Sequence, residues 1–174
     1  SYTELKKEIN NYVGYEPKNI TVGNGSSELL DLCVKTFLDK DEMILSLDPT
    51  FSMYSIYAQV FSAKYMGAKT EDDFKLNVDS IIEDIQKNSP KLIILCNPNN
   101  PTGSVLTKEE VRKIVKSTDA LIALDEAYME FGDESLIDEV MNYDNLLIVK
   151  TLSKAFSLAG IRMGYIVANE DIIN

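Results

Sequence analysis

The sequence predicts an α/β fold in which helices cover both faces of a mainly parallel sheet, giving three αβα layers. Short apolar runs typical of buried strands alternate with stretches whose apolar residues recur every three or four positions, as on amphipathic helices. The runs at 91–95 and 121–124 are apolar at nearly every position, which is typical of parallel strands covered on both faces. Because strand, turn and helix repeat along the chain, we expect right-handed crossover connections.

The first half of the chain supplies a first helix and two of these units. A first helix is predicted over the first dozen residues and ends near Gly14. A short strand at 20–22 leads through a glycine-containing turn into a helix whose apolar residues lie at 29–34. Residues 43–47 predict the next strand, and helical spacing over 56–61 predicts the helix that follows it.

The middle of the chain begins with a polar surface segment. Residues 65–77 carry several acids, and we expect at most a short strand there. A helix follows over 78–85 and stops before Pro90, which disfavours helical backbone in the residue preceding it. After the strand at 91–95, Thr107 begins a Thr-Lys-Glu-Glu capping box and therefore a helix.

The last third contains strands and one acidic connector. The strand at 121–124 is followed by an acidic connection over 133–144. Further strands are predicted at 146–149 and 166–168. A new helix is expected to begin near 173–174.

Composition limits the classes of function that fit. The chain has 174 residues, 45% of them hydrophobic and 26% charged, which fits one soluble domain with one core. No run approaches the length of a membrane span, and residues 1–7 lack the apolar core of a signal peptide. We therefore expect a cytoplasmic protein without a membrane partner.

The net charge and the absence of histidine argue against further classes of partner and of catalytic chemistry. A net charge of −11 argues against nucleic acid and anionic membranes as partners, although a single phosphate needs only a few oriented donors. With no histidine, this chain does not supply serine–histidine, cysteine–histidine or histidine–zinc chemistry. Cys33 and Cys96 lie far apart in apolar segments, so we expect reduced core thiols and no metal site.

Lys154 lies just past the predicted strand at 146–149, an unusual place for a lysine. We expect it to be flanked by Thr151 and Ser153 and walled in by apolar neighbours, namely Phe156, Leu158 and Ala159. Desolvation lowers a lysine pKa, and a neutral amine forms a Schiff base with an aldehyde. Arg162 offers a planar fork for a phosphate. The alternative is a partly buried structural lysine beside a helix.

Residues 23–28 join a strand to a helix through two glycines and two serines. This geometry directs backbone N–H groups at an anion, which makes Gly25, Ser26 and Ser27 candidates for a phosphate cradle. Simple capping of the helix by Ser26 or Ser27 explains the same residues equally well.

Three other candidates also follow predicted strands. Phe51 follows the strand at 43–47, where an aromatic residue is ordinarily part of the core. Asn100 lies in a turn with two Asn-Pro steps, which is stiffer than an ordinary loop requires. Asp125 ends a buried strand and needs a partner, which is ordinarily a lysine or a helix N-terminus.

All these candidates lie at the carboxyl ends of predicted strands. In open α/β sheets ligands bind in the crevice outside these ends. We therefore expect one site built from the following residues: Gly25, Ser26, Ser27, Phe51, Asn100, Asp125 and Lys154.

Five segments together resemble fold-type I pyridoxal-phosphate (PLP)-dependent aminotransferases of class I/II, and specifically the histidinol-phosphate aminotransferase branch. The segments are Gly-Asn-Gly-Ser-Ser-Glu at 23–28, Pro-Thr-Phe-Ser-Met-Tyr at 49–54, Asn-Pro-Asn-Asn-Pro-Thr-Gly at 97–103, Asp-Glu-Ala-Tyr at 125–128 and the lysine segment at 151–165. The resemblance covers nearly the whole chain. It departs at Ser27, Phe51 and Ser157, where the family usually or often has aspartate, tyrosine and glycine.

The resemblance implies a role for each candidate around pyridoxal 5'-phosphate. Lys154 binds the cofactor aldehyde, Asp125 faces the pyridine nitrogen, Asn100 and Tyr128 contact the phenolic oxygen, and Phe51 stacks on the ring. The phosphate is held by the remaining candidates: Gly25, Ser26, Ser27, Thr151, Ser153 and Arg162. Lys154, Asp125 and Tyr128 are the predicted catalytic residues.

The resemblance also implies a wider context. Residues 1–174 correspond to the PLP-binding large domain, without the upstream arm and the downstream small domain of the family. The implied activity is transamination between an amino donor and a 2-oxo acid in histidine or amino-acid biosynthesis, by a homodimer. Two alternatives stay open, namely a threonine-phosphate decarboxylase of the same fold and a non-catalytic cofactor-binding domain.

Overall fold

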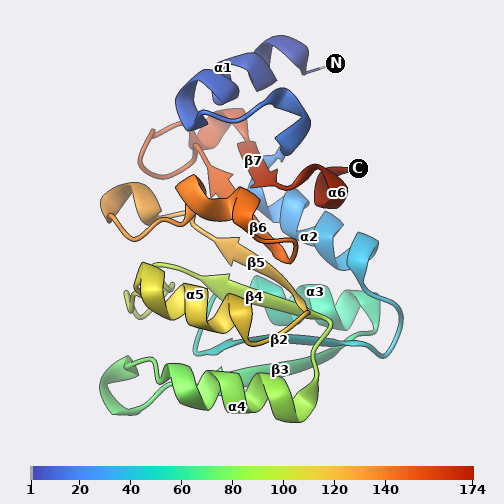
Figure 1. Ribbon diagram of the computed structural model, residues 1–174, viewed down its shortest axis with the longest axis vertical. Helices are drawn as coiled ribbons and strands as arrows, with labels where there is room; N and C mark the ends of the chain where they lie inside the picture. Colours follow the sequence, from blue (N-terminus) through green and yellow to red (C-terminus); the bar gives the residue numbers. More distant parts are fainter. Residues whose placement is uncertain (1) are drawn as a thin grey trace.

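A computed structural model describes residues 2–174 and contains a seven-stranded sheet between two layers of helices (Figure 1). The strands are β1 (Ile20–Asn24), β2 (Met43–Asp48), β3 (Lys64–Lys69), β4 (Leu92–Cys96), β5 (Leu121–Asp125), β6 (Leu146–Thr151) and β7 (Met163–Ala168). They lie in the order β1-β7-β6-β5-β4-β2-β3. The predicted α/β fold with three layers is confirmed.

The sheet is parallel from β3 to β6. The pairs β2–β3, β2–β4, β4–β5 and β5–β6 are parallel, whereas β7 runs antiparallel to both β6 and β1. Cys96 lies opposite Asp125 and Asp125 opposite Val149, so β4, β5 and β6 reach their carboxyl ends close together. This alignment gathers the loops after the three central strands at one edge.

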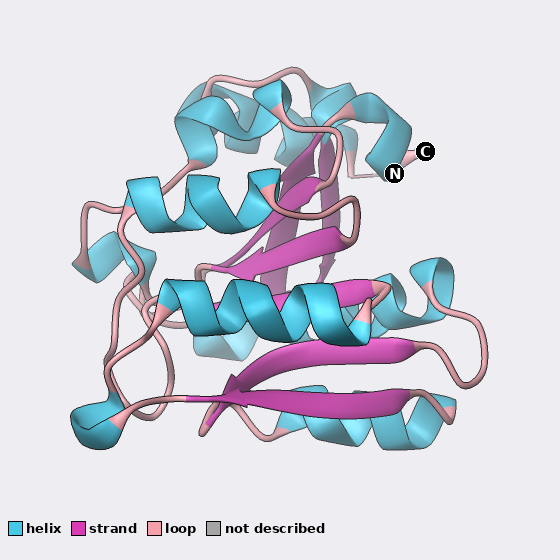
Figure 2. Cartoon of the chain, turned by 60° about the horizontal axis from the view of Figure 1, so that its bottom comes forward, coloured by secondary structure: helices cyan, strands magenta, loops and turns pink. Residues whose placement is uncertain are grey.

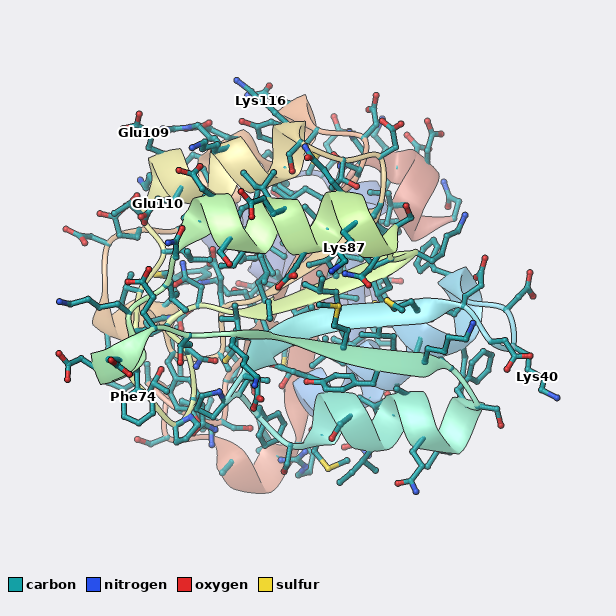
Figure 3. The ribbon with its side chains drawn as sticks, turned by 90° about the horizontal axis from the view of Figure 1, so that it is seen from below. Lys40, Phe74, Lys87, Glu109, Glu110 and Lys116 are labelled. Atoms are coloured by element: carbon teal, nitrogen blue, oxygen red, sulfur yellow. The ribbon has the colours of Figure 1, made fainter. Side chains whose placement is uncertain are left out.

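The helices divide between the two faces of the sheet. They are α1 (Thr3–Val13), α2 (Gly25–Phe37), α3 (Met53–Phe61), α4 (Val78–Asn88), α5 (Lys108–Lys116) and α6 (Glu170–Ile173). Buried residues of α1, α4 and α5 pack into one core cluster, and those of α2 and α3 into another. Figure 2 shows helices on both sides of the strands, and in Figure 3 α3 and α4 lie on opposite sides of β2 and β3.

Local sequence explains where individual helices end. Gly14 follows α1 at φ 81°, in the left-handed region that glycine adopts at little cost, and its N–H reaches the Asn10 carbonyl. Thr107 and Glu110 form the predicted capping box at the start of α5. Glu109 and Lys116 point from α5 into solvent (Figure 3).

Several elements differ in detail from the sequence prediction: β6 continues to Thr151, β7 begins at Met163 and α6 begins at Glu170. Strand β1 continues through Asn24 directly into α2, so Gly23 and Asn24 are strand residues and no separate turn exists. The polar segment at 65–77 contains β3, an edge strand that pairs along its whole length with β2. The acidic connector contains a 3-10 helix, η4 (Ile137–Asn142). None of the helices among residues 2–174 is long and apolar enough to cross a membrane.

Candidate active site

A pocket opens at the carboxyl ends of the central strands, and it gathers ten of the eleven site residues predicted from the sequence. It encloses about 520 Å³, including space open to solvent, which lies in the usual range for small-molecule sites. Its lining consists of Ser26, Ser27, Phe51, Cys96, Asn100, Asp125, Ala127, Tyr128, Thr151, Ser153, Lys154 and Arg162. The eleventh predicted residue, Gly25, lies behind the Arg162 guanidinium.

The N-terminus of α2 forms one wall of the pocket. Gly164 on β7 allows this close approach, because a Cβ atom there would lie 2.5 Å from the Ser26 nitrogen. Among residues 2–174, the side chain of Asn24, the N-cap residue of α2, makes no capping hydrogen bond, and neither Ser26 nor Ser27 caps the helix, so the capping explanation of Ser26 and Ser27 does not hold. The Glu28 carboxylate accepts the Asn24 N–H at 2.6 Å, whereas the N–H groups of the first turn have no side-chain partner in the part of the chain that the structure describes and lie beside the pocket.

Arg162 adds a positive charge to the same wall. Its guanidinium lies so close to Gly25 that a Cβ atom there would meet Nη2 at 2.6 Å. Arg162 has a left-handed backbone (φ 52°), and no carboxylate of the described chain forms a salt bridge with it. A helix N-terminus together with an unpaired arginine makes a site suited to a phosphate. Thr151 and Ser153 lie on the same pocket wall.

Asp125 forms the floor of the pocket and is almost completely buried, with 4% of its surface exposed. Its Oδ2 accepts a hydrogen bond from the Tyr54 hydroxyl at 2.8 Å, and its Oδ1 accepts one from the Ala127 N–H at 3.1 Å. Neither donor is a cation, and burial raises the pKa of Asp125 above its ordinary value. The lysine or helix N-terminus considered from the sequence is therefore not its hydrogen-bond partner.

The loop after β4 is ordered by two buried asparagines. Asn97 exchanges two hydrogen bonds with the backbone of Leu106, each 2.9 Å long. Asn99 accepts from the Thr50 hydroxyl at 2.6 Å and donates to the Pro49 carbonyl at 2.9 Å. Within the described chain, the side-chain amide of the next residue, Asn100, has no such bond and lies on the pocket wall. Rigid neighbours therefore present an amide that is free for a ligand.

Lys154 lies in the pocket, but the expectation that apolar neighbours wall it in is wrong. Lys154 is exposed, as are Phe156 (38%), Leu158 (41%) and Ala159. Its Nζ lies 5.3 Å from the centre of the Tyr128 ring, a cation–π distance. The loop that carries it turns outward after β6, so these side chains face solvent and the amine is directly accessible.

The desolvated lysine of this region is Lys150, which the sequence analysis did not single out. It is 5% exposed and lies on β6, where its Nζ bridges Glu126 at 3.0 Å and Glu130 at 2.9 Å. Its position at the end of an apolar run, followed by Thr151, is the sequence signal that could have revealed it.

Tyr54 and Cys96 are pocket neighbours that sequence reasoning also missed. Tyr54 is fully buried and contacts both Asp125 and Phe51. Its helical spacing with Tyr57 and Ala58 indicates only a core residue, so the sequence carries no separate signal for its hydroxyl contact. Burial raises the pKa of the Cys96 thiol to about 12, which fits the expected reduced core thiol.

The geometry therefore unites five chemical features in one pocket. It combines an anion-binding wall, a buried carboxylate without a cation, a free amide, an accessible amine and an aromatic ring. Over residues 1–174 the chain matches the profile of the family described as aminotransferase class I and II. The chain belongs to this family.

This chain spans about half the length of the aminotransferase relatives that it matches. A histidinol-phosphate aminotransferase of Clostridium novyi is 44% identical over 98% of the chain, which covers 48% of that protein. A crystal structure of the histidinol-phosphate aminotransferase from Clostridium acetobutylicum is 32% identical, with a TM-score of 0.89, over 99% of this chain and 52% of that one. A Sinorhizobium meliloti histidinol-phosphate aminotransferase solved with pyridoxal-5'-phosphate has a TM-score of 0.92 at 24% identity, over 98% of this chain and 48% of that one.

Proposed function

We propose that this chain binds pyridoxal 5'-phosphate and serves transamination between an amino donor and a 2-oxo acid. The observation that carries the proposal is the pairing of a buried, cation-free Asp125 with an accessible Lys154 amine in one pocket. A buried carboxylate costs several kcal/mol unless a partner compensates it, and a protonated pyridine nitrogen would do so. Membership of the aminotransferase family supports the same assignment.

The pocket residues fit the chemical groups of this cofactor. The unpaired Arg162 and the first turn of α2, with Ser26, Ser27 and Gly25, suit a phosphate. The free Asn100 amide and the Tyr128 hydroxyl suit a phenolic oxygen, and the half-buried Phe51 offers a flat face. Two further hydroxyl groups on the phosphate side belong to Thr151 and Ser153.

The chain's own residues then carry distinct parts of the reaction. When bound, the cofactor supplies an electron sink for the bonds around the substrate α-carbon. Asp125 would hold a proton on the cofactor's ring nitrogen, because its two neutral hydrogen-bond donors leave its charge uncancelled. Lys154 Nζ would hold the cofactor through its aldehyde group; once the amino group of the donor has taken its place, the freed amine would move a proton at the α-carbon of the donor, first as base and then as acid.

We propose histidinol phosphate as the amino donor and histidine biosynthesis in the cytoplasm as the setting. The names of the relatives that match most of this chain support the substrate. We further propose that residues 1–174 act as the large, cofactor-binding domain of the enzyme and that it works as a homodimer. Exposed apolar side chains near the pocket, Phe156, Leu158 and Ile161, together with Tyr12 on α1, suit such an interface.

Borohydride reduction tests the cofactor assignment directly. The chain is mixed with pyridoxal phosphate, reduced, digested and mapped by mass spectrometry. We expect a visible absorption band before reduction and a stable label on Lys154. A label on another lysine overturns the assignment, and the absence of any band rejects the proposed cofactor binding.

Product analysis of the whole enzyme tests the reaction type. Histidinol phosphate and threonine phosphate are each incubated with the enzyme and a 2-oxo acid. Formation of a new amino acid from the 2-oxo acid supports transamination. Release of carbon dioxide from threonine phosphate instead supports the decarboxylase alternative.

A further inference from the structure

Tyr54 connects two residues of the candidate site that lie far apart in the sequence. It lies on α3 and has no exposed surface. Its hydroxyl donates to Asp125 Oδ2 at 2.8 Å, across 71 positions of the chain. Its ring meets the Phe51 ring edge to face, with centroids 5.6 Å apart and an interplanar angle of 83°.

We propose that Tyr54 is a positioning residue whose hydroxyl favours the ionised form of Asp125 and fixes the orientation of this carboxylate and of the Phe51 ring. The role of Asp125 toward a ring nitrogen rests on the proposed function, whereas the effect of Tyr54 on the carboxyl group does not. Tyr54 acts through these two neighbours and does not line the pocket itself.

The two donors on Asp125 explain how a buried carboxylate stays available to a ligand. The Ala127 N–H holds Oδ1 and the Tyr54 hydroxyl holds Oδ2, so both oxygens have a fixed direction. Hydrogen bonds to the charged form of an acid favour that form, while a neutral donor leaves the negative charge in place. An arginine or lysine in the place of Tyr54 would cancel this charge before a ligand nitrogen arrives.

Other ionisable groups around Asp125 do not replace Tyr54. The groups that act on it or are acted on by it, from the elements packed around it, are Tyr54 and Tyr57 on α3, Cys96 on β4, Glu126 next in the chain and Lys154 after β6. Glu126 opposes ionisation of Asp125, and Lys154 favours it without a hydrogen bond. Among side chains of residues 2–174, Tyr54 alone donates to the Asp125 carboxylate.

Tyr57 provides a matched control on the same helix. It is also buried (7% exposed), and its hydroxyl donates to a backbone carbonyl, that of Ser27, at 3.1 Å. Tyr57→Phe and Tyr54→Phe therefore remove the same atom from similar surroundings. They differ in whether the lost hydrogen bond ends on Asp125.

The test measures the Asp125 pKa by ¹³C NMR of its side-chain carboxyl carbon in the cofactor-free chain. We expect Tyr54→Phe to raise the Asp125 pKa, because the charged form loses a donor, and Tyr57→Phe to leave it nearly unchanged. No shift in Tyr54→Phe, or equal shifts in both variants, overturns the proposal.

A second measurement needs no substitution and covers a failure of Tyr54→Phe to fold. In the unsubstituted chain the Tyr54 Cζ resonance should move with the same midpoint as the Asp125 carboxyl carbon, since protonation alters the bond that joins them. A Tyr54 resonance that ignores this titration contradicts the proposal.

Addition of pyridoxal phosphate separates the two proposals. We expect the pH dependence of the visible band to move in Tyr54→Phe and to stay in place in Tyr57→Phe. A chain that shows the NMR shift but never forms a visible band rejects the proposed function and leaves the effect of Tyr54 on Asp125 standing.

Discussion

At the ends of β5 and β6, each face of the sheet carries an acidic residue and a lysine. Among residues 2–174, they are unpaired on one face and form an ion pair on the other. On the face packed with α2 and α3, Asp125 and Lys154 line an open pocket, and neither forms a salt bridge within the described chain. On the other face, Glu126 and Lys150 form a closed ion pair that also includes Glu130. Side chains alternate across a strand, so neighbouring residues reach opposite faces.

On the closed face Lys150 pairs with both Glu126 and Glu130, although the buried Glu130 Oε2 has no hydrogen-bond partner among the described residues. Glu126 has no exposed surface and accepts hydrogen bonds from the Ser135 hydroxyl at 2.6 Å and the Leu136 N–H at 3.3 Å. Burial lowers the pKa of Lys150, but Glu126 and Glu130 outweigh burial and hold the pKa above its usual value. The difference teaches that burial alone does not mark a functional charge. Missing partners beside an open cavity mark it better.

The largest effect is expected when the closed face loses its cation. Lys150→Met removes the cation that pairs with the buried Glu126 and the half-buried Glu130, and it should lower the free energy of unfolding by about 3–5 kcal/mol. This is a large share of the roughly 5–15 kcal/mol that stabilises a typical domain. Urea denaturation followed by circular dichroism measures it, and a loss below about 1 kcal/mol would show that the pair is not structural.

The next largest effect concerns the open face and a phosphate. Arg162→Ala should weaken pyridoxal-phosphate binding by about 1.5–3 kcal/mol, since a hydrogen-bonded charge is lost from the anion site. Isothermal titration calorimetry measures the change. Arg112→Ala is the control, because that arginine is paired with Glu139 on α5 and η4, away from the pocket. Equal losses in both variants would place the phosphate elsewhere.

A smaller effect, in this case a stabilisation, is expected from substitution of Asp125, which lines the pocket. Burial raises the Asp125 pKa above the ordinary 3.8, so between the ordinary pKa and the raised one the folded state keeps a proton that the unfolded state has lost. Stability therefore falls as the pH rises from the ordinary value through the raised one. Asp125→Asn does not titrate and should stabilise the chain by roughly 0.5–2 kcal/mol above this window. Thermal unfolding across pH measures this, and an unchanged pH profile argues against it.

The smallest effect on stability is expected at Lys154. Lys154→Met should change the free energy of unfolding by less than about 0.5 kcal/mol, because the side chain is exposed and forms no salt bridge. The same variant should lose the borohydride-stable label completely. Urea denaturation of Lys154→Met and Lys150→Met side by side measures the contrast between the two faces. If Lys154→Met destabilises the chain as much as Lys150→Met, the contrast does not exist.

Much of the fold was predictable because its signals are local. Apolar runs indicated each central strand, and the Thr107 capping box and Gly14 indicated helix ends to within a residue. Edge strand β3 was harder, since half of its residues are polar or glycine and its pairing with β2 comes from a distant segment. The extent of β1 also depends on a remote partner, as it pairs with β7 through Asn24.

The membership of the candidate site was also contained in the sequence. Polar or aromatic residues after successive parallel strands must meet at one sheet edge, and ten of the eleven predicted residues line one pocket. Their environments were less predictable. The predicted surroundings of Lys154 were wrong because the direction of the loop after β6 is set by its tertiary packing. Ser157 and Arg162 in this loop both have left-handed backbone conformations.

The sequence by itself determined the succession of strands and helices along the chain and the aminotransferase-like motifs, since each depends on residues close together along the chain. It also indicated the sheet edge on which these motifs meet. Only the tertiary structure decided which charges are paired. The Tyr54 hydroxyl reaches Asp125 across 71 positions, and Lys150 closes on Glu126 from the neighbouring strand. Partner choice of this kind depends on distances in space and on exclusion of water, and neither is written in the spacing of residues.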